Sequence, residues 1–396
     1  MSANASMDEG LDHQQLNRCT LSRQMLLQRE RIPIPDVISR VVGLQAQEPV
    51  SPYVGLWNRV AEFEPGQLTR ELEQSAVVKA TLMRITLHIV SVSDYGHFHQ
   101  AMVPTLRAAG LNDRRFRQST LTVEQADDLV MRMLDYVAKP RQKDDVVRHL
   151  AQSLGEPISP GVWRALRMYA PLWHAPGDFP WAFGRSAQFH AASSGRSPDG
   201  GHTEQSRMVG LQHLVRQYLL GFGPATVGDF RQFTMIKKTD AQAAFDALAE
   251  ELVTYRRRDT PSGDVLYDLV DGPGVVSGQH PSPARLLPMW DSTLLAYADR
   301  SRVIPDHIRA EVIRRNGDVL PAVLVNGKVA GIWRPVDTGV EVTPLVFIES
   351  TGWEQIEGEV ERFGRFLDGR DPNIYHRYRR WWSKLPENGR RLLPFG

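Results

Sequence analysis

The order of helical and strand-like segments constrains this 396-residue chain most, because the same order recurs three times. In each pass, segments with helical spacing precede two runs rich in β-branched residues, and the passes lie roughly 80 to 100 residues apart. Three helices followed by a two-stranded ribbon is the order of a winged helix. The paired runs span residues 77–84 and 86–92, then 172–175 and 187–191, then 252–257 and 265–270.

Turn residues and helix-start signals place the expected helices and the domain boundaries. We predict winged helices at residues 12–120, 121–204 and 205–280, followed by a fourth domain at 281–396. The expected helices cover residues 22–42, interrupted at Pro33 and Pro35, and then 65–74, 122–137, 144–153, 159–169, 211–221, 226–234 and 240–250.

The fourth predicted domain is dominated by short strand-like runs. Asn326-Gly327 between two apolar runs is a strong hairpin signal. A helix is expected at 353–367, and an arginine-rich, aromatic tail follows at 375–382. The predicted fold class is therefore α+β, with tandem winged-helix units followed by a small β-barrel-like domain.

Composition bounds the setting of the protein rather than its chemistry. Cys19 is the single cysteine, so no internal disulfide can form, and a reducing cytoplasm is expected. No signal peptide or membrane span is predicted, so no membrane partner is expected. The net charge is only +1, but forty of the forty-seven basic residues are arginines, which suit forked contacts with phosphates and base edges. A GC-rich genome that favours arginine codons explains the same bias equally well.

The sequence predicts neither a metal nor a cofactor. His97 and His99 form the one candidate ligand pair, and at this spacing in a helix they face different ways. Gly221-Phe222-Gly223 lacks the remaining residues of a phosphate-binding loop.

Gln45-Ala46-Gln47 is the motif with the clearest chemical meaning. Two amides separated by one apolar residue can project together into one polar pocket. A glutamine is neither a general base nor a nucleophile at neutral pH, so such a pair must orient a water or stabilise a transient cation. The reaction then needs a leaving group that departs with little help.

Several other residues are candidates for the site, each with a structural alternative. Asp291 is either a carboxylate that steadies positive charge on a substrate or the cap of the next turn. Tyr297, Arg300 and Arg302 lie near the tip of an expected loop, which suits phosphate or minor-groove contact or simply a solvated charged turn. The remaining candidate DNA contacts are Arg84 and His88 in the first predicted wing and Arg256 and Arg257 in the third. A histidine in the position of His88 is more often structural.

Six strings, in order, resemble the AlkZ-like DNA glycosylases from about Leu21 to about Pro335. They are LSRQ at 21–24, GLQAQ at 43–47, LMRITLH at 82–88, GPAT at 223–226, LPMWD at 287–291 and DRSR at 299–302. The resemblance implies tandem winged helices around a DNA channel and excision of guanines alkylated at N7. It also implies that Gln45 and Gln47 are catalytic, and it places the chain in the Gln-x-Gln branch, which includes antibiotic self-resistance enzymes that remove bulky or crosslinking adducts.

The chemistry of the motif agrees with that resemblance. An N7-alkylated guanine already carries positive charge, so its glycosidic bond breaks without a strong acid, and amide oxygens suffice to hold a water against C1′. We therefore expect a monofunctional DNA repair glycosylase, acting as a monomer on double-stranded DNA that contains alkylated purines, in the cytoplasm at the nucleoid. The alternatives are a winged-helix transcription regulator and a lesion-binding protein that hydrolyses nothing.

Overall fold

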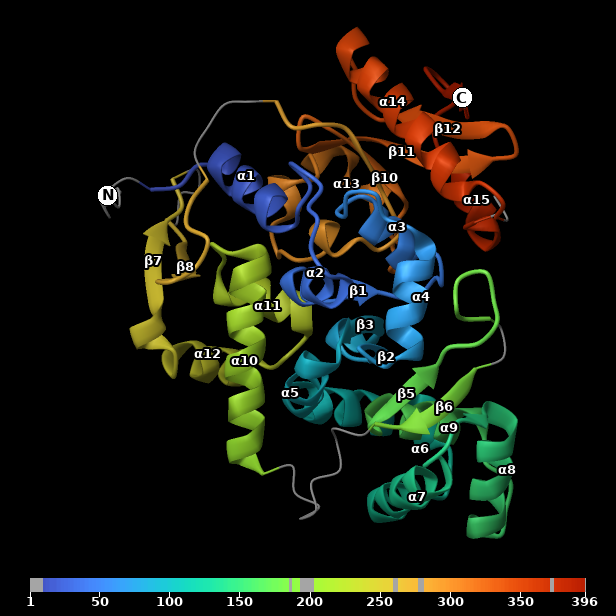
Figure 1. Ribbon diagram of the computed structural model, residues 1–396. Coiled ribbons are helices and arrows are strands. Elements are labelled where there is room, and N and C mark those ends of the chain that lie inside the picture. Colours follow the sequence, from blue (N-terminus) through green and yellow to red (C-terminus); the bar gives the residue numbers. More distant parts are fainter. Residues whose placement is uncertain are drawn as a thin grey trace.

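The computed structural model describes residues 10–184, 187–192, 203–258, 263–276, 281–370 and 374–395 (Figure 1). Helices and antiparallel strands are mixed throughout, so the fold is α+β, as predicted. None of the helices in these residues is long and apolar enough to cross a membrane.

One order of elements, helix, strand, helix, helix, strand, strand, occurs three times. In the third unit an isolated bridge between Ala225 and Tyr267 takes the place of the first strand. The first unit comprises α2 (Ile34–Arg40), β1 (Leu44–Gln45), α3 (Ser51–Trp57), α4 (Pro65–Glu73), β2 (Val77–Thr81) and β3 (Leu87–Ser91). The second comprises α7 (Val123–Tyr136), β4 (Arg141–Gln142), α8 (Lys143–Leu154), α9 (Pro160–Tyr169), β5 (Leu172–Ala175) and β6 (Gln188–Ala191). The third comprises α10 (Glu204–Phe222), α11 (Val227–Thr234), α12 (Lys238–Asp246), β7 (Leu252–Arg256) and β8 (Val265–Leu269).

Three helices within the first 120 residues lie outside these units and were not anticipated in the sequence. Helix α1 (His13–Arg23) begins well before residue 22, because Asp12 and Gln15 form a capping box at its start. Helix α5 (Val92–Leu111) runs from the first unit toward the second and contains Pro104. It crosses α10 closely, since a β-carbon at Gly210 would lie 2.6 Å from the carbonyl oxygen of His97. A short helix, α6 (Arg114–Arg117), follows α5.

The first two units share one six-stranded sheet in the order β1-β3-β2-β5-β6-β4. Each unit contributes its strands in the same relative order, so the two halves meet at their second strands. One residue pair, Lys79 with His174, joins β2 to β5. The predicted boundary between these units therefore does not divide the sheet.

The β1-β3-β2 part of this sheet lies between two hydrophobic cores. Successive residues alternate between its faces. Val77 and Ile89 belong to the core shared with the C-terminal region, whereas Val78 and Val90 belong to the core shared with the second and third units. The first unit is therefore central to the molecule, which agrees with its position in Figure 1.

The C-terminal region is built on a five-stranded antiparallel sheet in the order β13-β12-β11-β10-β9. The predicted hairpin is confirmed, because Asn326 and Gly327 both have positive φ between β10 and β11. The expected barrel is not observed: within the described residues β9 and β13 remain separate edges, so the sheet is open. The strands are β9 (Arg285–Leu287), β10 (Ala322–Val325), β11 (Lys328–Val336), β12 (Gly339–Pro344) and β13 (Arg391–Pro394), and the helices are α13 (Arg309–Val312), α14 (Ser350–Leu367) and α15 (Arg379–Trp382).

Candidate active site

Gln45 ends β1 and is buried, with 5% of its surface exposed. Its Oε1 accepts a hydrogen bond from Nη2 of Arg84 at 2.8 Å, and Nη1 of Arg84 donates to the carbonyl of Phe233 at 3.1 Å. Arg84 occupies the turn between β2 and β3 with φ of 53°, a conformation that favours glycine. The turn between β2 and β3 is thus held against the third unit, and the Gln45 amide is held by that turn.

His88 completes this interior network. Nη2 of Arg84 lies 3.2 Å from Nε2 of His88, and Nδ1 of His88 lies 3.1 Å from the carbonyl of Thr86. Because a guanidinium only donates, Nε2 must accept, and Nδ1 carries the proton and donates. Burial, with the charge of Arg84, lowers the pKa of His88 to about 3, so the ring is neutral. Burial, with repulsion from Arg300, lowers the pKa of Arg84 to about 9.

Asp291 borders the same small cavity as Gln45, but its contacts indicate a structural role. Both border an interior cavity of about 10 Å³, which is at the lower limit for one water. The two oxygens of Asp291 each accept from Arg59 at 2.9 Å, and Oδ1 also accepts from the backbone N–H of Thr293. Burial alone would raise the pKa of Asp291, but Arg59 outweighs it and the pKa is lowered. The carboxylate therefore caps its turn and neutralises a buried arginine.

Gln47, unlike Gln45, is exposed and borders an open cleft of about 520 Å³. The backbone bends at Gln47, two residues after β1 ends. Lys79, Leu87 and His174 border the same cleft. Gln188 of β6 also lines the cleft, together with Gly177, Phe179, Phe183 and Gly184 from the connection between β5 and β6.

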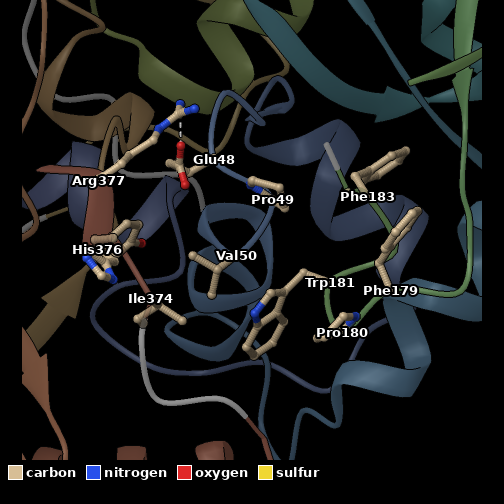
Figure 2. Close-up of a pocket in the computed structure, with 12 residues that line it drawn as sticks. Glu48, Pro49, Val50, Phe179, Pro180, Trp181, Phe183, Ile374, His376 and Arg377 are labelled. Atoms are coloured by element: carbon tan, nitrogen blue, oxygen red, sulfur yellow. Dashed lines mark ion pairs between the residues drawn. The ribbon is translucent and has the colours of Figure 1, made fainter. Parts of the chain in front are cut away.

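The cleft holds opposite charges in a partly buried setting. Glu48 forms an ion pair with Arg377 (Figure 2). It also accepts a hydrogen bond from the hydroxyl of Tyr378. Burial raises the pKa of Glu48, although Arg377 acts against this shift. Burial lowers the pKa of Lys79 to about 7, and its Nζ lies 4.0 Å from the centre of the Phe183 ring. Burial, with the charge of Lys79, also holds the pKa of His174 well below its ordinary value.

The two glutamines do not share one pocket, so that expectation is wrong. In the sheet Gln45 pairs with His88, which places both side chains on one face. Lys79 pairs with Ile89 on the other face, and this is the face that Gln47 joins. The physical reason is the bend at Gln47, which ends the regular alternation that the sequence argument assumed.

The predicted DNA contacts fall into three settings. Tyr297 and Arg302 are buried, with the guanidinium 4.0 Å from the ring centre and donating to the carbonyl of Pro224, so the expected exposed loop tip is wrong for both. Arg257 is also buried, and it forms an ion pair with Asp299 and a hydrogen bond with His13. Arg300 is half-buried, and Arg256 is exposed at the end of β7.

Sequence reasoning missed the charged and aromatic residues of the cleft. Lys79 stands between apolar residues in β2, and a lysine in such a place indicates that its side chain has an unusual, buried environment. Glu48 directly follows the motif, and Arg377 lies in the arginine-rich tail. Phe179 and Phe183 lie in the connection between β5 and β6, where no pattern in the sequence indicates their position. In the part of the chain that the structure describes, no group of three or more metal-ligating side chains is assembled.

Comparison with known proteins assigns this three-unit α+β chain to a class of DNA repair enzymes. The family described as "DNA glycosylase AlkZ-like" matches residues 38–366. The chain belongs to this family and is a DNA glycosylase.

Two further comparisons, one with a sequence and one with a solved structure from Streptomyces sahachiroi, extend the match over nearly the whole chain. The first is with a protein named "Interstrand DNA cross-link repair glycosylase", which is 26% identical over 367 residues, covering 87% of this chain and 94% of the relative. The solved structure of the DNA glycosylase AlkZ superposes with a TM-score of 0.74 at 22% identity, covering 90% of this chain and 97% of that one. The fold is therefore that of AlkZ.

Proposed function

We propose that this glycosylase hydrolyses the N-glycosidic bond of N7-alkylated guanine in duplex DNA, with Gln47 as the catalytic residue. The observation that carries the proposal is the position of Gln47, the one glutamine of the motif that borders an open cleft. The cleft also carries Lys79 and a Glu48 carboxylate that is already occupied by Arg377. An amide is then the group best placed to orient a water without competing for the cationic base.

The proposed reaction needs no acid because the leaving group is already charged. The bond between C1′ and N9 breaks, its electron pair stays with the base, and the base departs neutral. The Gln47 side-chain oxygen holds a water against the sugar cation, the water oxygen bonds to C1′, and its proton passes to solvent. No covalent link between enzyme and sugar forms, so the enzyme is monofunctional.

Gln45 acts as a positioning residue in this proposal. Its oxygen is bound by Arg84, which is itself bound to the third unit through Phe233. This fixes the end of β1 and therefore the bend that presents Gln47. We further propose that the three repeated units are winged helices that hold duplex DNA, and that the protein acts as a monomer.

Release of free base tests the proposal. A duplex with one 7-methylguanine is incubated with enzyme, and the free base is measured by chromatography. Gln47→Ala should lower the rate on the order of 10² or more, because an oriented catalytic dipole is lost. Gln188→Ala, which removes another glutamine from the same cleft, should change the rate less than threefold, as expected for a residue without a catalytic contact. Equal rates for Gln47→Ala and the unmodified enzyme would overturn the assignment.

The strand must also remain intact. The DNA backbone should stay unbroken until alkali is added, because no lysine attacks C1′. The relative named as a cross-link repair glycosylase leads us to propose that bulky and crosslinked adducts are substrates too. A crosslinked duplex that yields separable strands on a denaturing gel supports this extension, and one that stays linked contradicts it.

A further inference from the structure

The arginine-rich tail carries a tryptophan that three cations surround. The guanidinium carbons of Arg314 and Arg380 lie 5.4 and 5.0 Å from the centre of the Trp381 ring, and Nζ of Lys384 lies 4.9 Å from it. Arg380 and Lys384 are exposed, while Arg314 and Trp381 are half-buried. A cation this close to an indole is attracted to the ring, so one aromatic plate gathers all three charges. We call these four residues the Trp381 cluster.

The Trp381 cluster is short of negative charge. No two of its cations can be farther apart than twice the longest of these distances, a separation comparable with the Debye length of roughly 8–10 Å at physiological salt, so they repel one another. Among the described residues, Asp318 is the one carboxylate within ion-pair distance of the cluster, 3.5 Å from Nη2 of Arg380. The same oxygen, Oδ2, also accepts from the indole N–H of Trp381 at 2.7 Å and from the side-chain amide of Asn316 at 2.9 Å. One shared carboxylate oxygen thus faces three positive charges.

Arg314 has unmet hydrogen-bonding capacity. Its Nη1 donates to the carbonyl of Ala310 at 3.2 Å, but its Nε and Nη2 are enclosed by protein and have no hydrogen-bond partner among the described residues. Within the same part of the chain, no other arginine has two such nitrogens. Burial lowers the pKa of Arg314, against the attraction of Glu311. A guanidinium in this state is stabilised by an incoming anion.

Contacts with the interior hold part of the cluster in place before a ligand binds. The turn that carries Arg314 is closed by hydrogen bonds from the N–H of Arg314 to the carbonyl of Asp318 at 2.8 Å and from the N–H of Gly317 to the carbonyl of Arg314 at 2.9 Å. The carbonyl of Gly317 in turn accepts from the indole N–H of buried Trp290 at 3.0 Å. The Arg314 turn and the Trp381 ring are therefore already ordered, which lowers the entropy cost of binding.

The same tail continues into the cleft of about 520 Å³. Arg377, four residues before Trp381, borders that cleft and forms an ion pair with Glu48 (Figure 2). The ring of Tyr378 packs on that of Trp290, with ring centres 5.4 Å apart. Four residues of helix rise only about 6–8 Å, so the Trp381 cluster lies close to the cleft.

We propose that the Trp381 cluster binds the phosphodiester backbone of DNA beside the cleft. The site requires only that the chain is a DNA glycosylase, so it goes beyond the proposed function, whichever base is excised. A phosphodiester supplies the missing negative charge, and its oxygens accept hydrogen bonds from Arg314 and Arg380. The DNA backbone is favoured over an acidic protein segment because the cluster lies close to the cleft. Residues 379–384 follow the family match at 38–366, so the complete cluster is not a feature of that match.

Salt-dependent binding to undamaged duplex tests the site. A labelled duplex of ~30 base pairs, about three helical turns, is titrated by fluorescence anisotropy over a salt series. Arg380→Gln combined with Lys384→Gln should reduce the slope of log K against log salt by about 2, since each lost phosphate contact removes about 0.9. Arg31→Gln is the matched control and should leave the slope unchanged, because Arg31 is likewise exposed and paired with a carboxylate but lies outside the cluster.

Substitution of the ring distinguishes a built site from diffuse charge. Trp381→Leu removes no charge, yet it should weaken duplex binding about threefold, because the three cations lose the plate that gathers them. Trp381→Phe keeps an aromatic face and should recover most of the affinity. The midpoint of urea unfolding is measured for each variant. Where Trp381→Leu lowers that midpoint, the double variant at the exposed positions Arg380 and Lys384 decides alone.

Three results would overturn the site. An unchanged slope in the double variant, or an equal change in Arg31→Gln, would remove the cluster from the DNA interface. A folded Trp381→Leu protein that binds duplex like the unmodified protein would show that the three cations act independently. Polyglutamate is the alternative anion, and a double variant that loses affinity for it as much as for duplex would show recognition of any acidic chain. Because none of these ligands carries a lesion, a failure to release base would refute the proposed function and leave this test intact.

Discussion

The last two strands of the first unit and those of the second occupy equivalent positions, but the connections between them behave differently. The first is the short turn between β2 and β3, whose Arg84 points inward to Gln45, His88 and Phe233. The second is the long connection between β5 and β6, which leaves Phe179 and Phe183 beside an open cleft. On the first side the polar groups are bound in the interior, whereas on the second buried Lys79, exposed Phe179 and half-buried Phe183 border a cavity. The same order of elements thus builds a fixed interior on one face of a sheet and an open cleft on the other.

Asp291 gives the largest expected effect, on the interior side. Asp291→Ala should lower the free energy of unfolding by about 3–5 kcal/mol, because Arg59 is left buried without its partner. The midpoint of urea unfolding measures this. Glu62→Ala, which breaks an exposed pair with Arg31, should change stability by less than about 1 kcal/mol. A stable Asp291→Ala enzyme that no longer releases base would instead place Asp291 in catalysis.

Lys79 gives the next effect, on the cleft side, and it depends on pH. Burial beside Glu48 and His174 lowers its pKa in the folded protein to about 7 from the ordinary value of 10.5. Folding therefore disfavours the protonated form of Lys79. The free energy of unfolding is lowered most at and below pH 7, and it recovers as the pH rises from 7 to 10.5. Relative to Lys79→Met, the unmodified protein should gain about 2 kcal/mol between pH 7 and pH 9. Parallel stability curves for the two proteins would contradict the lowered pKa.

Gln45 gives a smaller effect that links the two sides. Gln45→Met removes the acceptor for Arg84 and should lower kcat about tenfold with little change in KM, since the bend at Gln47 loosens. Gln45→Glu restores an acceptor and should recover most of the rate. Steady-state kinetics on 7-methylguanine DNA measures both variants. A Gln45→Glu enzyme as slow as Gln45→Met would show that Gln45 does more than hold Arg84.

Arg256 gives the smallest effect. It is exposed in the third wing, whereas its neighbour Arg257 is buried against Asp299. Arg256→Ala should weaken binding to undamaged duplex a few-fold and reduce the slope of log K against log salt by about 1, as for one lost phosphate contact. Fluorescence anisotropy across a salt series measures this, and an unchanged slope would remove Arg256 from the interface.

The wing strands could be predicted because β-branched runs mark them locally. The expected strand at 172–175 coincides with β5, and Asn326-Gly327 forms the expected turn. For the candidate site, the sequence predicted the Gln45-Ala46-Gln47 motif but not the surroundings of its two glutamines. The bend after Ala46 and the burial of Arg302 over Tyr297 depend on contacts with distant segments, which no local pattern records. Helix α5 was missed for a related reason: Pro104 and its glycines weaken its local signal, and packing against α10 stabilises it.

Five residue pairs join β2 to β3, but a single pair, Lys79 with His174, connects the halves of the six-stranded sheet. This junction is a seam, because separating the halves sacrifices very little main-chain pairing. Lys79 and His174 also border the cleft, so parting the seam would widen the entrance next to Gln47. We expect faster amide hydrogen exchange at residues 79 and 174 when a bulky lesion is bound. Under the proposed function, this seam lies beside the cleft through which a bulky adduct would enter.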